Sequence, residues 1–223
     1  MQFSVQWLRN YVNPSLDSDE LAHALTMAGL EVEGMGPVAA PFTQVVIGQI
    51  ISAEKFPDAD RLQVCTVDVG QAKHLQVVCG AANARAGLKA PCALVGAKLP
   101  GEKPPGIEIK QAKVRGIESF GMMCSAKELG LAEESSGLLE LPADAPVGQD
   151  IRKFLELNDI LFALKLTPNR SDCLSIMGIA REVAAITGAA LELPKIMPVA
   201  EKSDKQKTVH VDETNACPRY CGR

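Results

Sequence analysis

Apolar residues recur every three to four positions in two widely separated segments, which is the period of an amphipathic helix. The first helix is expected to begin at Asp17, since Asp17 and Glu20 have the spacing of a capping box, and to end at Gly29. The second is expected to carry its apolar stripe from Ile176 onward and to end at Gly188. The pattern therefore predicts one helical segment toward each end of the chain.

The residues between these helices follow a different pattern, in which short β-rich runs alternate with turn residues. The stretch Gly34–Pro37 interrupts the regular pattern and is the expected boundary between the first helical segment and the β-rich block. Ser125 and Glu128 again have capping-box spacing before Gly130, so a short helix is expected to plug one end of the sheet. Five strands and a plug helix are typical of an OB-type barrel. The expected β runs are 45–52, 62–69, 75–79, 93–97, 107–114 and 138–141.

The predicted fold class is α+β, with a five-stranded OB-type β-barrel inserted into a small discontinuous helical α+β domain. The two flanking helical segments are expected to pack together, so that the ends of the insertion lie close in space. A polar stretch at 202–207 and a strand-like run at 208–211 suggest the opening of a further domain. The expected domains are 1–38 and 151–200 (the two parts of the discontinuous domain), 39–150 (the barrel), and 201–223 (a linker and the start of a truncated next domain).

Composition and charge exclude several classes of protein. Of the 223 residues, 47% are hydrophobic and 22% charged, which is typical of a globular protein. A net charge of -4 argues against a protein that binds nucleic acid through uniform positive charge. The sequence shows no apolar run of the ~20 residues that a membrane helix needs and no signal-peptide pattern. Seven cysteines, an odd number, fit a reducing compartment, so a cytoplasmic location without a membrane partner is predicted.

Charge is divided unevenly within the β-rich block. Residues 85–115 hold seven basic and two acidic residues, a net charge of +5, whereas residues 116–150 hold one basic and seven acidic residues, a net charge of -6. If the barrel keeps these stretches apart, one rim is basic enough to contact phosphates. The alternative is an ordinary solvated surface.

The sequence shows no enzyme signature. A phosphate-binding loop, a dinucleotide fingerprint and a nucleophile elbow are all missing, and the three histidines stand apart from one another. Cys217 and Cys221 are close in sequence but have no second pair of metal ligands. No catalytic residue and no metal site are therefore predicted, and the chain alone is expected to be inactive.

Several separated motifs resemble a known family. The runs Phe56–Leu62, Val78–Asn83 and Arg115–Ser125 resemble the tRNA-binding OB domain shared by several aminoacyl-tRNA synthetases and free-standing tRNA-binding proteins. The flanking runs Met27–Glu33 and Thr167–Leu174 resemble the start of the bacterial phenylalanine–tRNA ligase beta subunit family. One departure is Phe56, where the family often has histidine.

The resemblance implies an enzyme of two alpha and two beta subunits that attaches phenylalanine to tRNA(Phe) using ATP and magnesium. This chain is then expected to bind no cofactor itself and to supply auxiliary tRNA binding, with tRNA(Phe) and the alpha subunit as partners. Two alternatives stay open: an assembly or spacer module with negligible RNA binding, and a free-standing tRNA-binding protein. The candidate RNA contacts, whose charges or donors suit phosphate and ribose, are Asn83, Arg85, Lys110, Lys113, Arg115, Ser119 and Ser125.

Overall fold

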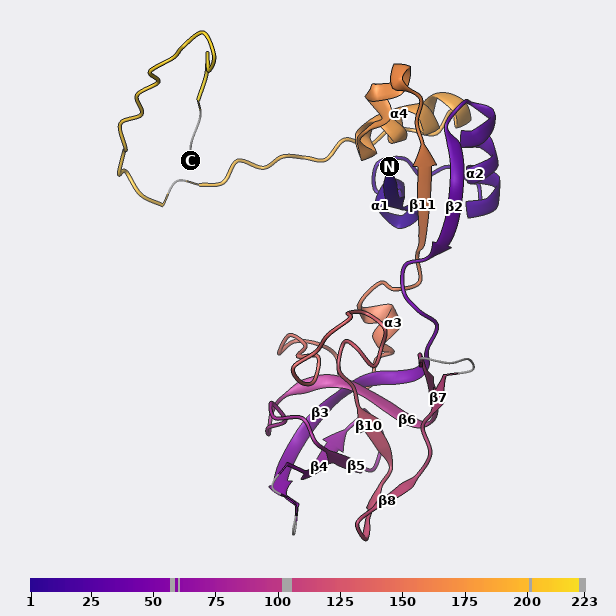
Figure 1. Cartoon of the computed structure of the whole chain (residues 1–223), viewed down its shortest axis with the longest axis vertical. Helices are drawn as coiled ribbons and strands as arrows, with labels where there is room; N and C mark the ends of the chain where they lie inside the picture. The colour runs from indigo at the N-terminus through magenta and orange to yellow at the C-terminus, as the bar shows by residue number, and fades with distance from the viewer. Residues whose placement is uncertain (57–58, 60, 102–105, 201, 221–223) are drawn as a thin grey trace. The chain divides into compact units, whose positions relative to one another are not determined.

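The computed structural model describes residues 1–56, 59, 61–101, 106–200 and 202–220 (Figure 1). Met1–Glu192 form one compact unit, and Leu193–Arg223 form a second. Residues 208–211 are not a strand, so that prediction is wrong. An extended segment becomes a strand only when a neighbour pairs with its backbone, and the described part of the second unit supplies none. None of the helices in the described ranges combines the length and the apolar character that a membrane span requires.

The first and last parts of Met1–Glu192 build one small α+β domain, which we call the base domain. Its antiparallel sheet has the order β1-β11-β2, so a strand from the later part lies between two strands from the earlier part. Phe162 on β11 is fully buried and meets Phe3 edge to face, with ring centroids 5.8 Å apart. The expected packing of the two flanking segments is therefore confirmed. The elements are β1 (Gln2–Ser4), α1 (Val5–Arg9), α2 (Ser18–Met27), β2 (Glu31–Pro37), β11 (Ile160–Lys165), the 3-10 helix η1 (Pro168–Cys173) and α4 (Ile176–Thr187).

Both predicted helices of the base domain form with the expected ends. Asp17 caps α2, and its side chain and that of Glu20 make the reciprocal contacts of a capping box. Gly29, with φ +89°, follows the end of this helix in the left-handed conformation that favours glycine. Ser175 caps the start of α4, and Gly188, with φ 72°, ends it. Local sequence signals were sufficient for these helices.

The expected break at Gly34–Pro37 is wrong, because these residues belong to β2. Gly34 stands opposite Ala163, and Pro37 stands opposite Ile160. Pairing with a strand that is distant in sequence satisfies this backbone and overrides the low β propensity of the glycines. Immediately beyond the strand, the Val38 amide donates to the Asp159 carbonyl at 3.0 Å. The two ends of the inserted segment therefore meet, whereas the predicted domain limits stay predictions.

The inserted segment forms a curled five-stranded antiparallel half-barrel with the order β10-β6-β3-β4-β5, as expected for an OB-like domain (Figure 1). Strands β4 and β5 alternate buried and more exposed positions, so one face lines the interior and the other faces outward. The expected runs 45–52, 75–79 and 93–97 are confirmed as parts of strands, and the expected run 62–69 contains the strand Gln63–Asp68. The elements are β3 (Thr43–Lys55), β4 (Gln63–Asp68), β5 (Leu75–Cys79), β6 (Lys89–Leu99), β7 (Ile107–Glu108), β8 (Ala112–Val114), β9 (Ile117–Ser119), β10 (Gly121–Met123) and α3 (Ile151–Phe154).

Three predictions for the later part of the barrel need correction. The run 107–114 is divided into β7, which pairs with β6, and β8, which pairs with β9. The run 138–141 is not a strand, since its backbone makes only separate hydrogen bonds, such as that from Leu141 to Lys89. The expected plug helix is a single turn, although Ser125 and Glu128 do make the capping contacts. The chain turns away at Gly130, which has φ +67°, before a second helical turn can form.

The cysteines are mostly enclosed by the two domains. Cys65, Cys79, Cys92, Cys124 and Cys173 are buried free thiols, whereas Cys217 is exposed. Burial raises the pKa of Cys92 to about 12, so its thiol stays protonated at neutral pH. The remaining cysteine, at position 221, lies outside the described residues.

Candidate nucleic-acid interface

A surface groove lies between the β8–β9 hairpin and the outward face of the neighbouring strands. Its volume is about 570 Å³, and we call it the hairpin groove. Strands β4 and β5 are the second and third strands of the barrel, and the hairpin belongs to the connection between the fourth and fifth. OB folds bind oligonucleotides with this strand face and with that connecting loop. The groove is lined by Glu54, Lys55, Val64, Gln76, Lys113, Gly116, Ile117 and Glu118.

The hairpin is built around a two-residue turn. Arg115 and Gly116 both have positive φ, 45° and 92°, and the flanking residues Val114 and Ile117 stand opposite each other. Positive φ at both central positions is the mark of a type I′ turn, whose twist matches that of the strands. The predicted contact Arg115 therefore lies at the tip of the hairpin, and Lys113 lies on the strand that leads to it.

The base of the hairpin is attached to β5 by Ser119, another predicted RNA contact. Ser119 is only 5% exposed; its hydroxyl accepts a hydrogen bond from the Val78 amide and donates one to the Gly121 carbonyl, both at 3.0 Å. A buried hydroxyl with both of these partners stabilises the barrel, because losing either partner would leave a polar group unsatisfied. The hydroxyl is thus engaged inside the barrel and is not presented on its surface.

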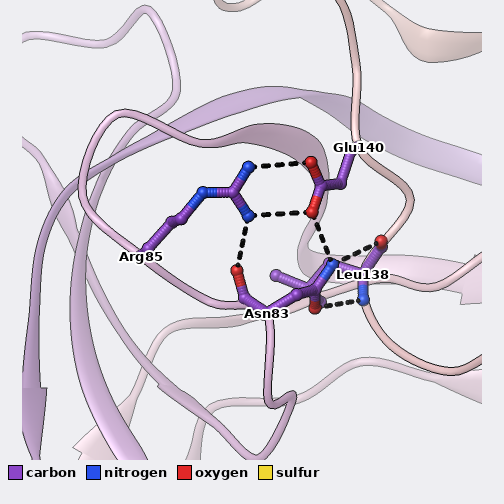
Figure 2. Close-up of polar contacts among 4 residues, drawn as sticks. All are labelled: Asn83, Arg85, Leu138 and Glu140. Carbon is purple, nitrogen blue, oxygen red and sulfur yellow. Dashed lines mark hydrogen bonds and ion pairs between the residues drawn. The ribbon is translucent and has the colours of Figure 1, made fainter.

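Asn83 and Arg85 lie in a separate polar cluster away from the groove lining (Figure 2). The Asn83 side chain donates to the Leu138 carbonyl at 3.1 Å and accepts from the Leu138 amide at 2.9 Å, so it acts as a clamp on that backbone. Arg85 makes two hydrogen bonds to Glu140, each 2.8 Å long. These side chains attach the loop after β5 to the segment after residue 137. This structural role accounts for both residues without any contact to RNA.

Replacing Glu140 with glutamine is expected to change how stability depends on pH. Hydrogen bonds from Arg85, and next from Asn83, lower the pKa of Glu140 from its ordinary value of 4.5 to about 2. A lowered carboxyl pKa contributes stability above the unfolded value and loses it as the pH falls toward the folded value. The stability deficit of Glu140→Gln should therefore be constant near neutral pH and shrink between pH 4.5 and about 2.

Urea denaturation across that pH range measures this deficit. Glu133→Gln, at an exposed position, is the control that removes one carboxylate elsewhere in the barrel. A deficit for Glu140→Gln that stays the same down to pH 2 would show that the ion pair has no role in acid stability.

The other predicted contacts are divided between the groove and the rest of the surface. Ser125 donates its hydroxyl hydrogen to Glu128 at 2.7 Å, and Lys110 is exposed between β7 and β8. Of the seven predicted contacts, the groove lining contains Lys113 alone. Sequence reasoning missed Lys55, which ends β3 directly before the Phe56 motif, because its approach to the hairpin depends on strand pairing.

The condition for a basic rim, that the barrel keeps the basic and acidic stretches apart, is not met. Within the basic stretch itself, Lys98 stands opposite Glu108 across β6 and β7. Across the hairpin, Lys113 stands opposite Glu118, which belongs to the acidic stretch. The ion pair of Figure 2 joins the two stretches again. These contacts set basic residues beside acidic ones, and the groove itself contains two lysines and two glutamates. Any phosphate contact there depends on local geometry and not on a broad positive field.

A cluster of possible metal ligands in the base domain is an ion-pair network. Candidate ligand atoms of Asp172, Cys173 and Glu182 lie within 4.8 Å of one another. The Arg170 guanidinium lies 3.2 Å from Asp172 and 2.8 Å from Glu182. Its hydrogen bond lowers the pKa of Asp172. The guanidinium therefore supplies the positive charge that a metal ion would bring to these carboxylates.

Comparison with known proteins agrees with this architecture. Residues 45–150 match the family model described as "Putative tRNA binding domain". The half-barrel is therefore an OB-like domain of the tRNA-binding class. The whole chain is a homologue of phenylalanine–tRNA ligase beta subunits: those of Aromatoleum aromaticum and Thiobacillus denitrificans are each 61% identical to it over 223 residues. These matches cover 100% of this chain and 28% of the length of each relative.

Two solved structures show lower similarity. A MetRS-related protein from Pyrococcus horikoshii is 23% identical with a TM-score of 0.33, over 47% of this chain and 85% of that one. The C-terminal domain of Plasmodium vivax p43 is 20% identical with a TM-score of 0.33, over 49% of this chain and 63% of that one.

Proposed function

We propose that the chain is the N-terminal tRNA-binding region of a phenylalanine–tRNA ligase beta subunit, and that the hairpin groove makes an auxiliary contact with tRNA. The observation that carries this proposal is the position of the groove. It lies on the strand face that OB folds use for oligonucleotides, within the segment that matches the tRNA-binding family. The similarity to the relatives extends over the base domain as well, which argues against a free-standing tRNA-binding protein.

The groove suits an RNA backbone better than a stack of bases. Lys55 and Lys113 line the groove and offer ammonium groups for phosphate. Among the described residues that line the groove none is aromatic, so they offer no stacking platform of the kind that many single-strand binders use. We therefore expect modest affinity without strong base preference.

The chemistry of aminoacylation is proposed to lie outside this chain. The parent enzyme would attach phenylalanine to tRNA(Phe) in the cytoplasm, with ATP and magnesium bound by its other parts. The alpha subunit is the proposed protein partner, in an assembly of two alpha and two beta subunits. This chain would contribute a surface that helps to hold the tRNA.

A titration of labelled tRNA(Phe) into the chain tests the proposal. Two phosphate contacts give a slope of roughly -1.4 to -1.8 for log affinity against log salt, so raising salt from about 50 mM to about 200 mM should weaken binding about 7- to 12-fold. The spacer alternative, which the balanced charge of the groove favours, predicts no saturable binding at either concentration. Absence of binding at the lower salt concentration would reject auxiliary tRNA binding by this chain.

A further inference from the structure

The β8–β9 hairpin has little support of its own. Its two strands form a separate two-stranded sheet, and within the described residues no strand ladder joins it to the half-barrel. Each of the two strands has three residues. An isolated hairpin is marginally stable in water, so this one depends on individual contacts to keep its position.

Gln76 supplies contacts to the hairpin on the groove side. Its side-chain amide donates to the Glu118 carbonyl at 2.7 Å, and its own backbone carbonyl accepts from the Phe120 amide at 2.9 Å. Ser119, between these two residues, is anchored separately through its buried hydroxyl. Gln76 is itself exposed and lines the groove. The hydrogen bond of its side chain therefore does not satisfy a polar group in the core. Losing this bond should loosen the hairpin and leave the barrel core intact.

The position of Lys113 follows from this attachment. Lys113 stands directly opposite Glu118, the residue whose carbonyl Gln76 holds. A displacement of β9 from β5 would carry β8 with it and move the Lys113 ammonium out of the groove. We propose that Gln76 is a positioning residue for RNA binding: its side chain latches the hairpin over the strand face and so keeps Lys113 in place. This inference rests on the proposed function of the groove.

Hydrogen exchange in the RNA-free chain tests the latch directly. Gln76→Met keeps the length of the side chain but removes the donor. Amides of residues 112–119 should exchange about 3- to 10-fold faster in this variant, with the melting temperature nearly unchanged, because one exposed hydrogen bond is lost. Gln2→Met, the same replacement at an exposed strand position of the base domain, should leave exchange in the hairpin unchanged. Unchanged hairpin exchange in Gln76→Met would reject the latch.

A double-mutant cycle then links the latch to RNA. Gln76→Met should weaken tRNA(Phe) binding about 3- to 10-fold, and Lys113→Ala should weaken it by a similar factor. If Gln76 acts by placing Lys113, adding Gln76→Met to Lys113→Ala should cost less than about twofold more. Full additivity of the two losses would overturn the positioning role.

The two parts of the experiment separate this inference from the proposed function. A chain that shows no tRNA binding contradicts the proposed function and with it the role of Gln76 in binding. Hydrogen exchange in Gln76→Met still decides whether the latch exists. A chain that binds tRNA and is weakened by Lys113→Ala, but not by Gln76→Met, keeps the proposed function and rejects the inference.

Discussion

Reversing the charge of Lys55 and Lys113 together, as Lys55→Glu and Lys113→Glu, is expected to weaken tRNA(Phe) binding at least about 30-fold at low salt. Each reversal replaces an attraction of ~1 kcal/mol to a nearby phosphate with a repulsion of similar size, and 1.4 kcal/mol corresponds to a factor of ten. The groove also contains Glu54 and Glu118, so its local charge would become strongly negative. The salt dependence should flatten by roughly 1.4 to 1.8 in slope, since two phosphate contacts are lost.

A matched variant separates the position of these charges from their number. Lys127→Glu with Lys153→Glu makes the same change in net charge at two exposed lysines that do not line the groove. Fluorescence anisotropy with labelled tRNA, measured at several salt concentrations, compares the two pairs. If both pairs weaken binding equally, the effect is one of net charge, and the hairpin groove is not the contact surface.

Replacing Phe162 with alanine is expected to lower the free energy of unfolding of the base domain by about 3 to 5 kcal/mol. Phe162 is fully buried on the central strand β11, and its removal leaves a cavity beside Phe3. The buried clusters of the half-barrel contain residues from 42 to 151 and do not include Phe162. The barrel and its tRNA binding should therefore be affected much less than the base domain.

The single tryptophan makes this difference measurable. Trp7 lies on α1, so its fluorescence during urea denaturation reports the base domain, whereas far-UV circular dichroism also follows the barrel strands. In Phe162→Ala the fluorescence transition should move to lower urea and separate from the later part of the dichroism transition. The control is Leu161→Ala, because Leu161 is the neighbour of Phe162 on the same strand and is 37% exposed. This control should shift the fluorescence transition little. Two transitions that move together would instead mean that both domains unfold as one cooperative unit.

The sequence by itself determined the features that depend on neighbouring residues. Capping residues and left-handed glycines defined the ends of α2 and α4, because these contacts are made within one or two turns of the chain. Short β-rich runs between turn residues identified β4 and β5, because strand propensity depends on residues that are neighbours in the chain. Together with the separated motifs, these local signals were enough for the OB-like class and for the family.

The tertiary structure alone decided which residues meet. Ser119 was a candidate for RNA by its chemistry, but the packing of the hairpin against β5 buries its hydroxyl, which accepts a hydrogen bond from the Val78 amide. Lys55 approaches Lys113 at the groove only because β3, β4 and the hairpin lie together, and Gly34 joins a strand because β11 is its neighbour. The spacing of residues along a chain does not specify contacts between segments far apart, since those contacts form only when the segments pack into one core.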